Sequence, residues 1–266
     1  MENKTSIISQ MPSRRATYAF MEDLFEIIFP VENIATSKQE VKSEKQLITD
    51  LSNLIVPLFS NDTTASNHLT QKFISEIASF RQMLLSDAEL FLTSDPAANS
   101  LEEIIIAYPG FYAIVMYRIS HFLLLQGIPI LPRLTSEIAH SRTGIDIHPG
   151  ATIGHPFFID HGTGVVIGET TFIGNFVKIY QGVTLGAMAV KQQIKSVKRH
   201  PTIENNVVIY AGACILGGNT IVGHDSIIGG NVWLTNSVPP FSVVTHKADI
   251  HIRDKSELND TINYII

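Results

Sequence analysis

From Ile147 onward, branched apolar residues recur every sixth position. The pattern runs through Ile147, Ile153 and Ile159, then Ile167, Ile173, Ile179 and Leu185, and finally Ile203, Ile209, Ile215, Ile221 and Ile227. A period of six fits neither an isolated helix nor a hairpin. It predicts a chain wound into triangular coils, with one short strand per face and each sixth side chain pointing inward. Branched side chains suit this stacking because they are stiff.

Two interruptions break the rhythm. The step from Ile159 to Ile167 is eight, which places two extra residues within 160–164. The step from Leu185 to Ile203 is eighteen, yet residues 187–200 have no six-residue pattern and include four basic side chains. We therefore predict a bulge at the first position and an extruded loop at the second. Insertions in a solenoid concentrate where function lies.

The first half of the chain has helical spacing. Apolar stripes run through 16–29, 45–59 and 69–92, while 112–126 is apolar almost all round and predicts a buried helix. The first stripe consists of Tyr18, Met21, Leu24, Phe25 and Ile28, and the breaks fall at Pro30, Pro57, Pro96 and Pro109. We expect a helical domain over 1–142, a solenoid over 143–240 and a tail over 241–266.

Composition narrows the class of protein. The chain has 266 residues and a net charge of −6 with no long basic run, so nucleic acid is an unfavourable partner. A single cysteine, Cys214, excludes an intramolecular disulfide. The N-terminus lacks the apolar core of a signal peptide, and Pro109 and Arg118 interrupt the most apolar stretch. We expect no membrane span and a cytoplasmic protein.

Five short segments carry a resemblance. They are Asp146-Ile-His-Pro, Asp160-His161-Gly-Thr-Gly, Gly168-Glu169-Thr170, Val183-Thr-Leu-Gly186 and Arg199-His200-Pro201. In this order and spacing they resemble the hexapeptide-repeat acyltransferases, and within them closely the serine acetyltransferases, over about residues 95–240. The resemblance implies an α+β chain: an all-helical N-terminal domain followed by a left-handed parallel β-helix with an extruded loop.

It also implies a reaction, the transfer of acetyl from acetyl-CoA to the hydroxyl of L-serine, the first step of cysteine biosynthesis from serine. A serine hydroxyl needs a base, and imidazole, with a pKa of ~6.5, suits neutral pH. By resemblance His161 is that base, and Asp146 orients its ring. The alternatives are a structural histidine on a turn and a turn aspartate.

The resemblance also assigns substrate contacts. Asp95 and Asp160 match carboxylates that bind the serine ammonium, Arg199 and His200 match the carboxylate-binding residues, and Glu169 supports the site. The alternatives are plainer. Asp95 would cap a helix that starts at Pro96, Arg199 would be a solvated loop charge, and Glu169 a corner carboxylate.

Small residues mark the expected acetyl-CoA contacts. These are Gly186, Ala211, Gly212 and Gly229, where a narrow pantetheine arm can approach the backbone. A backbone N–H near Gly186 would stabilise the oxyanion. Each glycine is equally explained as a corner residue. Lys191, Lys195 and Lys198 are candidate phosphate contacts or plain solvated charges.

Partners follow from the resemblance too. Its members form trimers, often paired into hexamers, with active sites between chains, and many are inhibited by L-cysteine. Their C-terminal isoleucine docks into O-acetylserine sulfhydrylase (cysteine synthase), and Ile266 occupies that position here. The alternative is a frayed terminus or a tail packed on the chain itself.

Rival functions remain. The same fold serves acyltransferases for homoserine, sugars or amines, and a non-catalytic regulator of cysteine synthase is a further alternative. His148, His155 and His224 would suit a trimeric zinc site as in β-helical carbonic anhydrases, but we expect no catalytic metal. Two departures from the family concern loops: residues 187–190 differ in composition, and 215–223 is one residue longer than usual.

Overall fold

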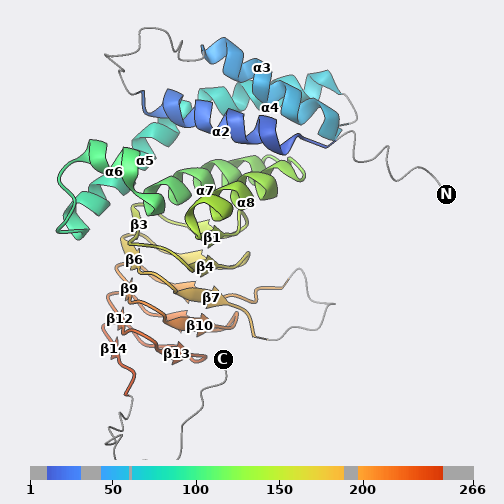
Figure 1. Ribbon diagram of the computed structural model, residues 1–266. Coiled ribbons are helices and arrows are strands. Elements are labelled where there is room, and N and C mark those ends of the chain that lie inside the picture. Colours follow the sequence, from blue (N-terminus) through green and yellow to red (C-terminus); the bar gives the residue numbers. More distant parts are fainter. Residues whose placement is uncertain (1–10, 31–42, 60–61, 189–196, 248–266) are drawn as a thin grey trace, which may run out of the picture.

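In the computed structural model a layer of helices lies over one end of a solenoid (Figure 1). The structure describes residues 11–30, 43–59, 62–188 and 197–247. Its helices are α2 (Arg14–Ile28), α3 (Glu44–Ile55), the 3-10 helix η1 (Val56–Phe59), α4 (Thr63–Ser75), α5 (Ile77–Ser94), α6 (Leu101–Ala107), α7 (Pro109–Leu125) and α8 (Leu131–Thr143). None of the helices formed by these residues is both long and apolar enough to cross a membrane.

Local sequence explains where the helices begin and end. Side chains of Ser13, Asp62 and Ser100 accept hydrogen bonds from backbone N–H groups in the first turns of α2, α4 and α6. Pro109 occupies the first position of α7, where its missing N–H costs nothing. The predicted burial of that helix is confirmed, because side chains on all sides of α7 are buried.

Two predictions for the helical half are wrong. The stripe over 69–92 predicted one element, but the chain breaks at Glu76 between α4 and α5. Apolar spacing continues across the break and hides it. Tyr18 was placed on the buried stripe of α2, but it is exposed and Phe20 is buried instead.

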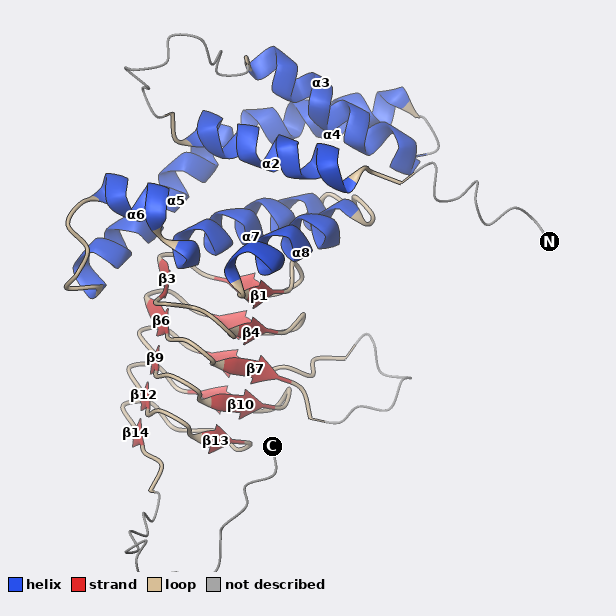
Figure 2. Cartoon of the chain, in the orientation of Figure 1, coloured by secondary structure: helices blue, strands red, loops and turns tan. Residues whose placement is uncertain are grey.

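The described residues of the solenoid form fourteen short strands. They are β1 (Asp146–Ile147), β2 (Thr152–Ile153), β3 (Phe157–Ile159), β4 (Val166–Ile167), β5 (Phe172–Ile173), β6 (Val177–Ile179), β7 (Thr184–Gly186), β8 (Thr202–Ile203), β9 (Val208–Ile209), β10 (Cys214–Leu216), β11 (Ile221–Val222), β12 (Ile227–Ile228), β13 (Trp233–Leu234) and β14 (Val243–Val244). They form three parallel sheets, with orders β1-β4-β7-β10-β13, β11-β8-β5-β2 and β14-β12-β9-β6-β3 (Figure 2). Each strand pairs with strands of the neighbouring coils, as the six-residue period predicts.

The register confirms both predicted interruptions. Asp146 pairs with Val166, twenty positions later, where three repeats of six give eighteen. The two extra residues therefore form a bulge between β3 and β4. Thr184 pairs with Cys214, thirty positions later, so β7 and β10 lie on adjacent coils. The intervening chain includes an excursion and not a hidden coil, and its residues 189–196 lie outside the described residues.

The predicted inward positions fail after Ile215. Ile221 is 43% exposed and Ile227 is 38% exposed, while Val222 and Ile228 are fully buried. The extra residue in 215–223 shifts the register by one, so the next residue of each pair turns inward. A one-residue shift moves a strand's apolar set to the opposite face.

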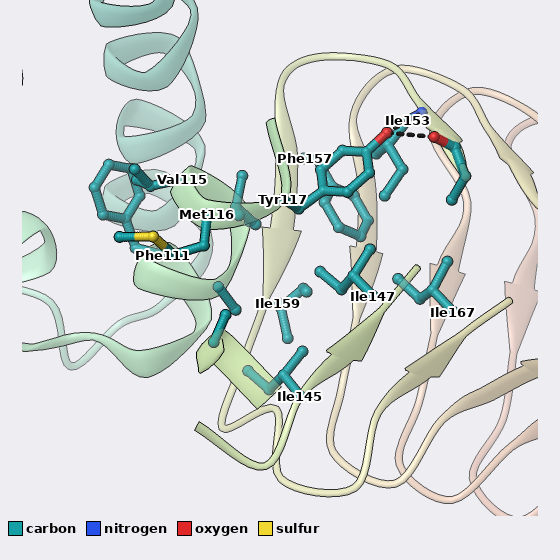
Figure 3. Close-up of a cluster of buried hydrophobic side chains, with 14 of the residues drawn as sticks. Phe111, Val115, Met116, Tyr117, Ile145, Ile147, Ile153, Phe157, Ile159 and Ile167 are labelled. Carbon is teal, nitrogen blue, oxygen red and sulfur yellow. Dashed lines mark hydrogen bonds between the residues drawn. The ribbon is translucent and has the colours of Figure 1, made fainter. Parts of the chain in front are cut away.

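The two halves share one hydrophobic core. In Figure 3, Phe111, Val115 and Met116 of α7 lie beside Ile145 and Ile159 of the first coil. The Tyr117 hydroxyl donates to the Ala151 carbonyl at 2.6 Å and accepts from the Ile153 N–H at 3.1 Å. A Cβ at Gly110 would lie 2.1 Å from the Ile159 carbonyl oxygen. The start of α7 thus packs directly on the end of β3.

A buried ion pair locks α5 to the same strand. Arg118 donates to both oxygens of Asp87, from Nε at 2.7 Å and from Nη2 at 2.9 Å. Asp87 also accepts from the Phe157 N–H at 2.8 Å, and Arg118 donates to the carbonyls of Ile153 and Gly154. The pair thus joins α5 to α7 and both helices to the first coil, which fixes where β3 begins relative to α5.

We predict that Arg118→Met destabilises the protein strongly. Leaving the Asp87 carboxylate buried without its partner should cost about 3–5 kcal/mol. The double variant Asp87→Leu/Arg118→Met should lose less, because no charge stays buried. Urea unfolding measures both. Arg142→Met removes a partly exposed ion pair with Glu22 and serves as control, with a loss of about 1 kcal/mol or less. Equal losses for Arg118→Met and Arg142→Met would contradict the role of the buried pair.

Candidate active site

The bulge after β3 holds His161 away from the solenoid. His161 has a φ of 55°, a left-handed conformation that a non-glycine residue adopts only when its surroundings impose it. Backbone hydrogen bonds pin the turn on both sides, from Asp160 N–H to the Ile179 carbonyl at 2.9 Å and from Gly164 N–H to the Gly144 carbonyl at 2.8 Å. The imidazole is consequently 71% exposed at a corner of the solenoid. It is open to a substrate.

Asp160 lies beside that imidazole. Its side chain is only 18% exposed, and its Oδ2 is 3.6 Å from Nε2 of His161. The two residues predicted to bind the ammonium and to act as base are therefore adjacent in space as well as in sequence.

Asp95 occupies the end of α5. Its N–H donates to the Phe91 carbonyl at 2.9 Å, its Oδ1 accepts from the Ala97 N–H at 2.8 Å, and its Oδ2 accepts from the Tyr108 hydroxyl at 2.9 Å. The capping alternative is wrong in detail. Asp95 closes a turn, and the next helix, α6, begins later, after Ser100.

Asp95 and Asp160, here called the carboxylate pair, both contribute to the raised pKa of the same two tyrosines, Tyr108 and Tyr180. The hydrogen bond to Asp95, with burial and the charges of both carboxylates, raises the pKa of Tyr108 to about 12. Burial raises the pKa of Tyr180, and the same two carboxylates add to the shift. Two carboxylates near the same tyrosines could together receive an ammonium group.

Asp146 begins β1, whose partner strand β4 follows the bulge. Its carboxylate lies with the side chains of Glu137 and His140 of α8, and their possible ligand atoms are all within 4.8 Å of one another. Among the described residues, neither a hydrogen bond nor an ion pair joins Asp146 to His161. Its orienting role stays a prediction.

Arg199 belongs to a second group of side chains. It forms an ion pair with Glu169, and that hydrogen bond lowers the pKa of Glu169. The N–H groups of Arg199 and His200 both donate to Oγ1 of Thr170, at 2.9 and 3.1 Å. Lys198 donates from Nζ to the carbonyls of Thr170 and His200, at 2.9 and 2.8 Å, and its candidate contact with a phosphate stays a prediction. The loop thus returns to the solenoid at a defined position.

His200 is held in one tautomer. Its Nδ1 accepts from the Thr170 N–H at 3.0 Å, so the proton of the neutral ring lies on Nε2. Burial, with the nearby Arg199 charge, lowers the pKa of His200 to about 4. The ring packs against Gly168, where a Cβ would lie 2.0 Å from it. At neutral pH His200 is therefore an uncharged hydrogen-bond donor.

These groups lie at two different corners of the solenoid. Asp160 and His161, at the His161 corner, precede β4, while Glu169 and Thr170, at the Arg199 corner, follow β4. Within the described part of one chain, no hydrogen bond or ion pair connects the two corners. The residues predicted to bind serine therefore form two separate groups in one chain. The group at the His161 corner would bind an ammonium, and the group at the Arg199 corner would bind a carboxylate.

The predicted acetyl-CoA residues lie on lower coils. Gly186 ends β7, Ala211 and Gly212 form the turn before β10, and Gly229 follows β12. Packing alone explains two of these glycines. Gly212 has a φ of 72° and a Cβ there would lie 2.4 Å from Asn231 Oδ1, while a Cβ at Gly186 would lie 2.8 Å from Leu216 Cδ2. Their role toward CoA stays a prediction. Lys191 and Lys195 lie outside the described residues.

Sequence reasoning missed Tyr108 and the anchoring role of Thr170. Thr170 was part of a quoted motif, but its hydroxyl had no assigned partner. Tyr108 belonged to no motif and lies thirteen residues from Asp95 in the chain. The one available signal was Tyr-Pro-Gly at 108–110, which places the ring directly before a proline-initiated helix.

Comparison with known proteins identifies relatives of the chain. No protein-family model matches it. It is 53% identical over 185 residues to "Serine acetyltransferase, plasmid" of Synechococcus elongatus; the match covers 68% of this chain and 58% of that protein. The structure of serine acetyltransferase isoform 3 of Entamoeba histolytica in complex with cysteine superposes with a TM-score of 0.77 at 37% identity, covering 89% of this chain and 84% of that one. The serine acetyltransferase of Neisseria gonorrhoeae in complex with serine superposes with a TM-score of 0.62 at 27% identity, covering 87% and 95%.

We predict that His200 makes stability depend on pH below neutrality. Its pKa is depressed in the folded state, so the unfolded chain takes up a proton near pH 6.5 that the folded chain refuses until about pH 4. The stabilisation is therefore present above pH 6.5 and is lost as pH falls toward 4. In His200→Asn, whose Oδ1 can replace Nδ1 as acceptor, this part of the pH dependence should vanish. Urea unfolding at pH 7 and pH 5 tests it; an identical decline in both proteins would refute it.

Proposed function

Because the chain belongs to the serine acetyltransferase family, we propose that it transfers the acetyl group of acetyl-CoA to the hydroxyl of L-serine, giving O-acetyl-L-serine and CoA. The observation that carries the proposal is the His161 corner. It presents an exposed imidazole beside a carboxylate pair, as a reaction between an amino alcohol and a thioester requires. The reaction is the first step of cysteine biosynthesis from serine.

His161 is the general base. It takes the proton of the serine hydroxyl as the oxygen attacks the thioester carbonyl, and the ester bond forms. When the tetrahedral intermediate collapses, the C–S bond breaks and CoA leaves as a thiolate, to which the imidazolium can return the proton. Asp160, 3.6 Å from Nε2, stabilises the positive charge that the ring carries between these steps. Asp146 is assigned the orienting role by family resemblance.

The two corners divide the recognition of L-serine. The carboxylate pair binds the ammonium, and Arg199 with the neutral Nε2–H donor of His200 binds the carboxylate, while Glu169 fixes the guanidinium. L-cysteine carries the same two charged groups, so the same side chains would hold it as a feedback inhibitor. Acetyl-CoA is the co-substrate, and its arm would pass Gly186, Ala211, Gly212 and Gly229. We expect no metal to take part.

We further propose that each active site is completed by two chains of a homotrimer. The His161 and Arg199 corners flank opposite ends of β4, so one chain presents them on different edges. Three parallel solenoids around a threefold axis would bring the His161 corner of one chain to the Arg199 corner of the next. By family resemblance, two such trimers would pair into a hexamer through their helical domains.

Docking on cysteine synthase through Ile266 is a separate proposal from family resemblance. The tail from residue 248 lies outside the described residues. Two rival functions are weaker. A sugar or a simple amine would not need both an ammonium and a carboxylate receptor, whereas homoserine carries both groups and is separated from serine by the comparison of acceptors below. A non-catalytic regulator would not need an exposed imidazole beside a carboxylate.

We predict that His161→Ala lowers acetyl transfer to serine by about 10²- to 10⁴-fold, because the base is lost. Release of free thiol from acetyl-CoA is measured with L-serine, homoserine and water as acceptors. His224→Ala is the matched control, since His224 is also an exposed histidine bonded to a neighbouring aspartate, Asp225, at 2.7 Å. Its activity should equal that of the wild type.

Two outcomes would reject the assignment. Full activity of His161→Ala would show that His161 is not the base. Thiol release by the wild type that L-serine does not stimulate would show that L-serine is not the acceptor.

We predict that His161→Ala and Arg199→Ala complement each other in mixed trimers. Each variant alone should be inactive. When the two are co-expressed equally with different tags, about a quarter of the interfaces join an intact His161 to an intact Arg199 of the partner subunit, so about a quarter of the activity should return. Mixed trimers that stay inactive would show that both corners must come from one chain.

A further inference from the structure

Tyr108 hydrogen-bonds to Asp95, one member of the carboxylate pair, and has no role in the reaction described above. Its hydroxyl donates to Oδ2 of Asp95 at 2.9 Å. The second oxygen of Asp95 accepts from the Ala97 N–H, within its own turn. Among the described residues, Tyr108 is therefore the side chain from elsewhere in the chain that fixes the Asp95 carboxylate.

Tyr108 is itself held firmly on two sides. It directly precedes Pro109 and Gly110, and Gly110 packs against the Ile159 carbonyl next to Asp160. Its ring lies edge-on to Phe91 with centroids 6.1 Å apart, and Phe91 contacts Phe158 in the same way at 4.7 Å. Backbone and ring contacts thus hold the Tyr108 ring in place while its hydroxyl donates to Asp95.

The hydroxyl also stays a donor under working conditions. Its pKa of about 12, which follows mainly from the bond to Asp95, keeps the proton on oxygen at neutral pH. An O–H that donates to a carboxylate restricts the carboxylate to one orientation and leaves lone pairs on both oxygens for a second donor. A substrate ammonium offers that donor.

We propose that Tyr108 is a specificity-determining positioning residue, which orients Asp95 to receive the α-ammonium of the acceptor. This rests on the proposed function. The consequence is a preference for L-serine over 3-hydroxypropionate, which has the hydroxyl and the carboxylate but lacks the amine. The hydroxyl of Tyr108 acts through Asp95 and touches neither the thioester nor the reacting hydroxyl.

The test is Tyr108→Phe, which removes one oxygen and keeps the ring. A hydrogen bond to a charged group is worth roughly 1.5–3 kcal/mol, so KM for L-serine should rise about tenfold or more. The KM for acetyl-CoA and the kcat at saturating serine should stay within about twofold of the wild type, since the base and the thioester site are unchanged. For 3-hydroxypropionate, which lacks the amine, kcat/KM should not change. If it does not react, its inhibition constant against serine replaces kcat/KM.

Tyr112→Phe is the matched control. Tyr112, one turn further along α7, donates to a carboxylate of Glu22 at 2.8 Å, away from the carboxylate pair. This substitution should leave the kinetic constants for L-serine and for 3-hydroxypropionate unchanged. An unchanged KM for serine in Tyr108→Phe overturns the inference while leaving the proposed function intact. Equal losses with serine and 3-hydroxypropionate, together with a lower melting temperature, show a merely structural role and overturn it as well. An inactive wild type refutes the proposed function instead.

Discussion

The contact between α5 and β3 is the constraint on which the site depends. Three residues, each four positions apart, follow one another along α5 and its C-terminal cap: Asp87, Phe91 and Asp95. Asp87 accepts from the Phe157 N–H, Phe91 packs on Phe158, and Asp95 accepts from the Tyr108 hydroxyl. The ion pair of Asp87 with Arg118 sets this register at its buried end. The exposed end of the same contact is where the substrate ammonium would bind.

In the solenoid, the side chains that form the core are different from those with proposed functions. Its inward side chains form a continuous apolar stack, and its three sheets repeat one hydrogen-bond pattern from coil to coil. Asp160 and His161 lie at one corner and Arg199 and His200 at another, where an insertion changes the local path without changing the stack, while Asp146 begins β1 and Gly186 ends β7. The two-residue bulge exposes His161, and the long excursion after β7 returns with Arg199 and His200 bound to Thr170. Regular coils therefore tolerate irregular corners, and the irregular corners hold the chemistry.

Much of this could be predicted from the sequence, and the failures have physical causes. The period of six located the inward residues up to Ile215 because, apart from the bulge after β3 and the excursion after β7, no residue is inserted between successive repeats there. It failed at Ile221 and Ile227 because each is followed by another branched apolar residue, so two registers fit the pattern equally and only the inserted residue decides. The break at Glu76 was hidden because apolar residues continue at helical spacing on both sides of it.

The candidate site was predicted as a set of residues but not as a geometry. Motif order identified Asp95, Asp160, His161 and Arg199, yet it could not place them at two corners. Tyr108 lay beyond reach because its contact with Asp95 depends on the turn through α6, which no periodic pattern encodes. Asp146 shows the converse case: a motif assigns it to His161, whereas the single chain places its carboxylate beside Glu137 and His140.

A crystal structure of the oligomer with L-serine bound tests the account most directly. The account predicts the ammonium between Asp95 and Asp160, the hydroxyl within hydrogen-bond distance of His161, and the carboxylate on Arg199 of the partner subunit. Serine bound with its ammonium away from the carboxylate pair, or held entirely by one chain, would contradict it.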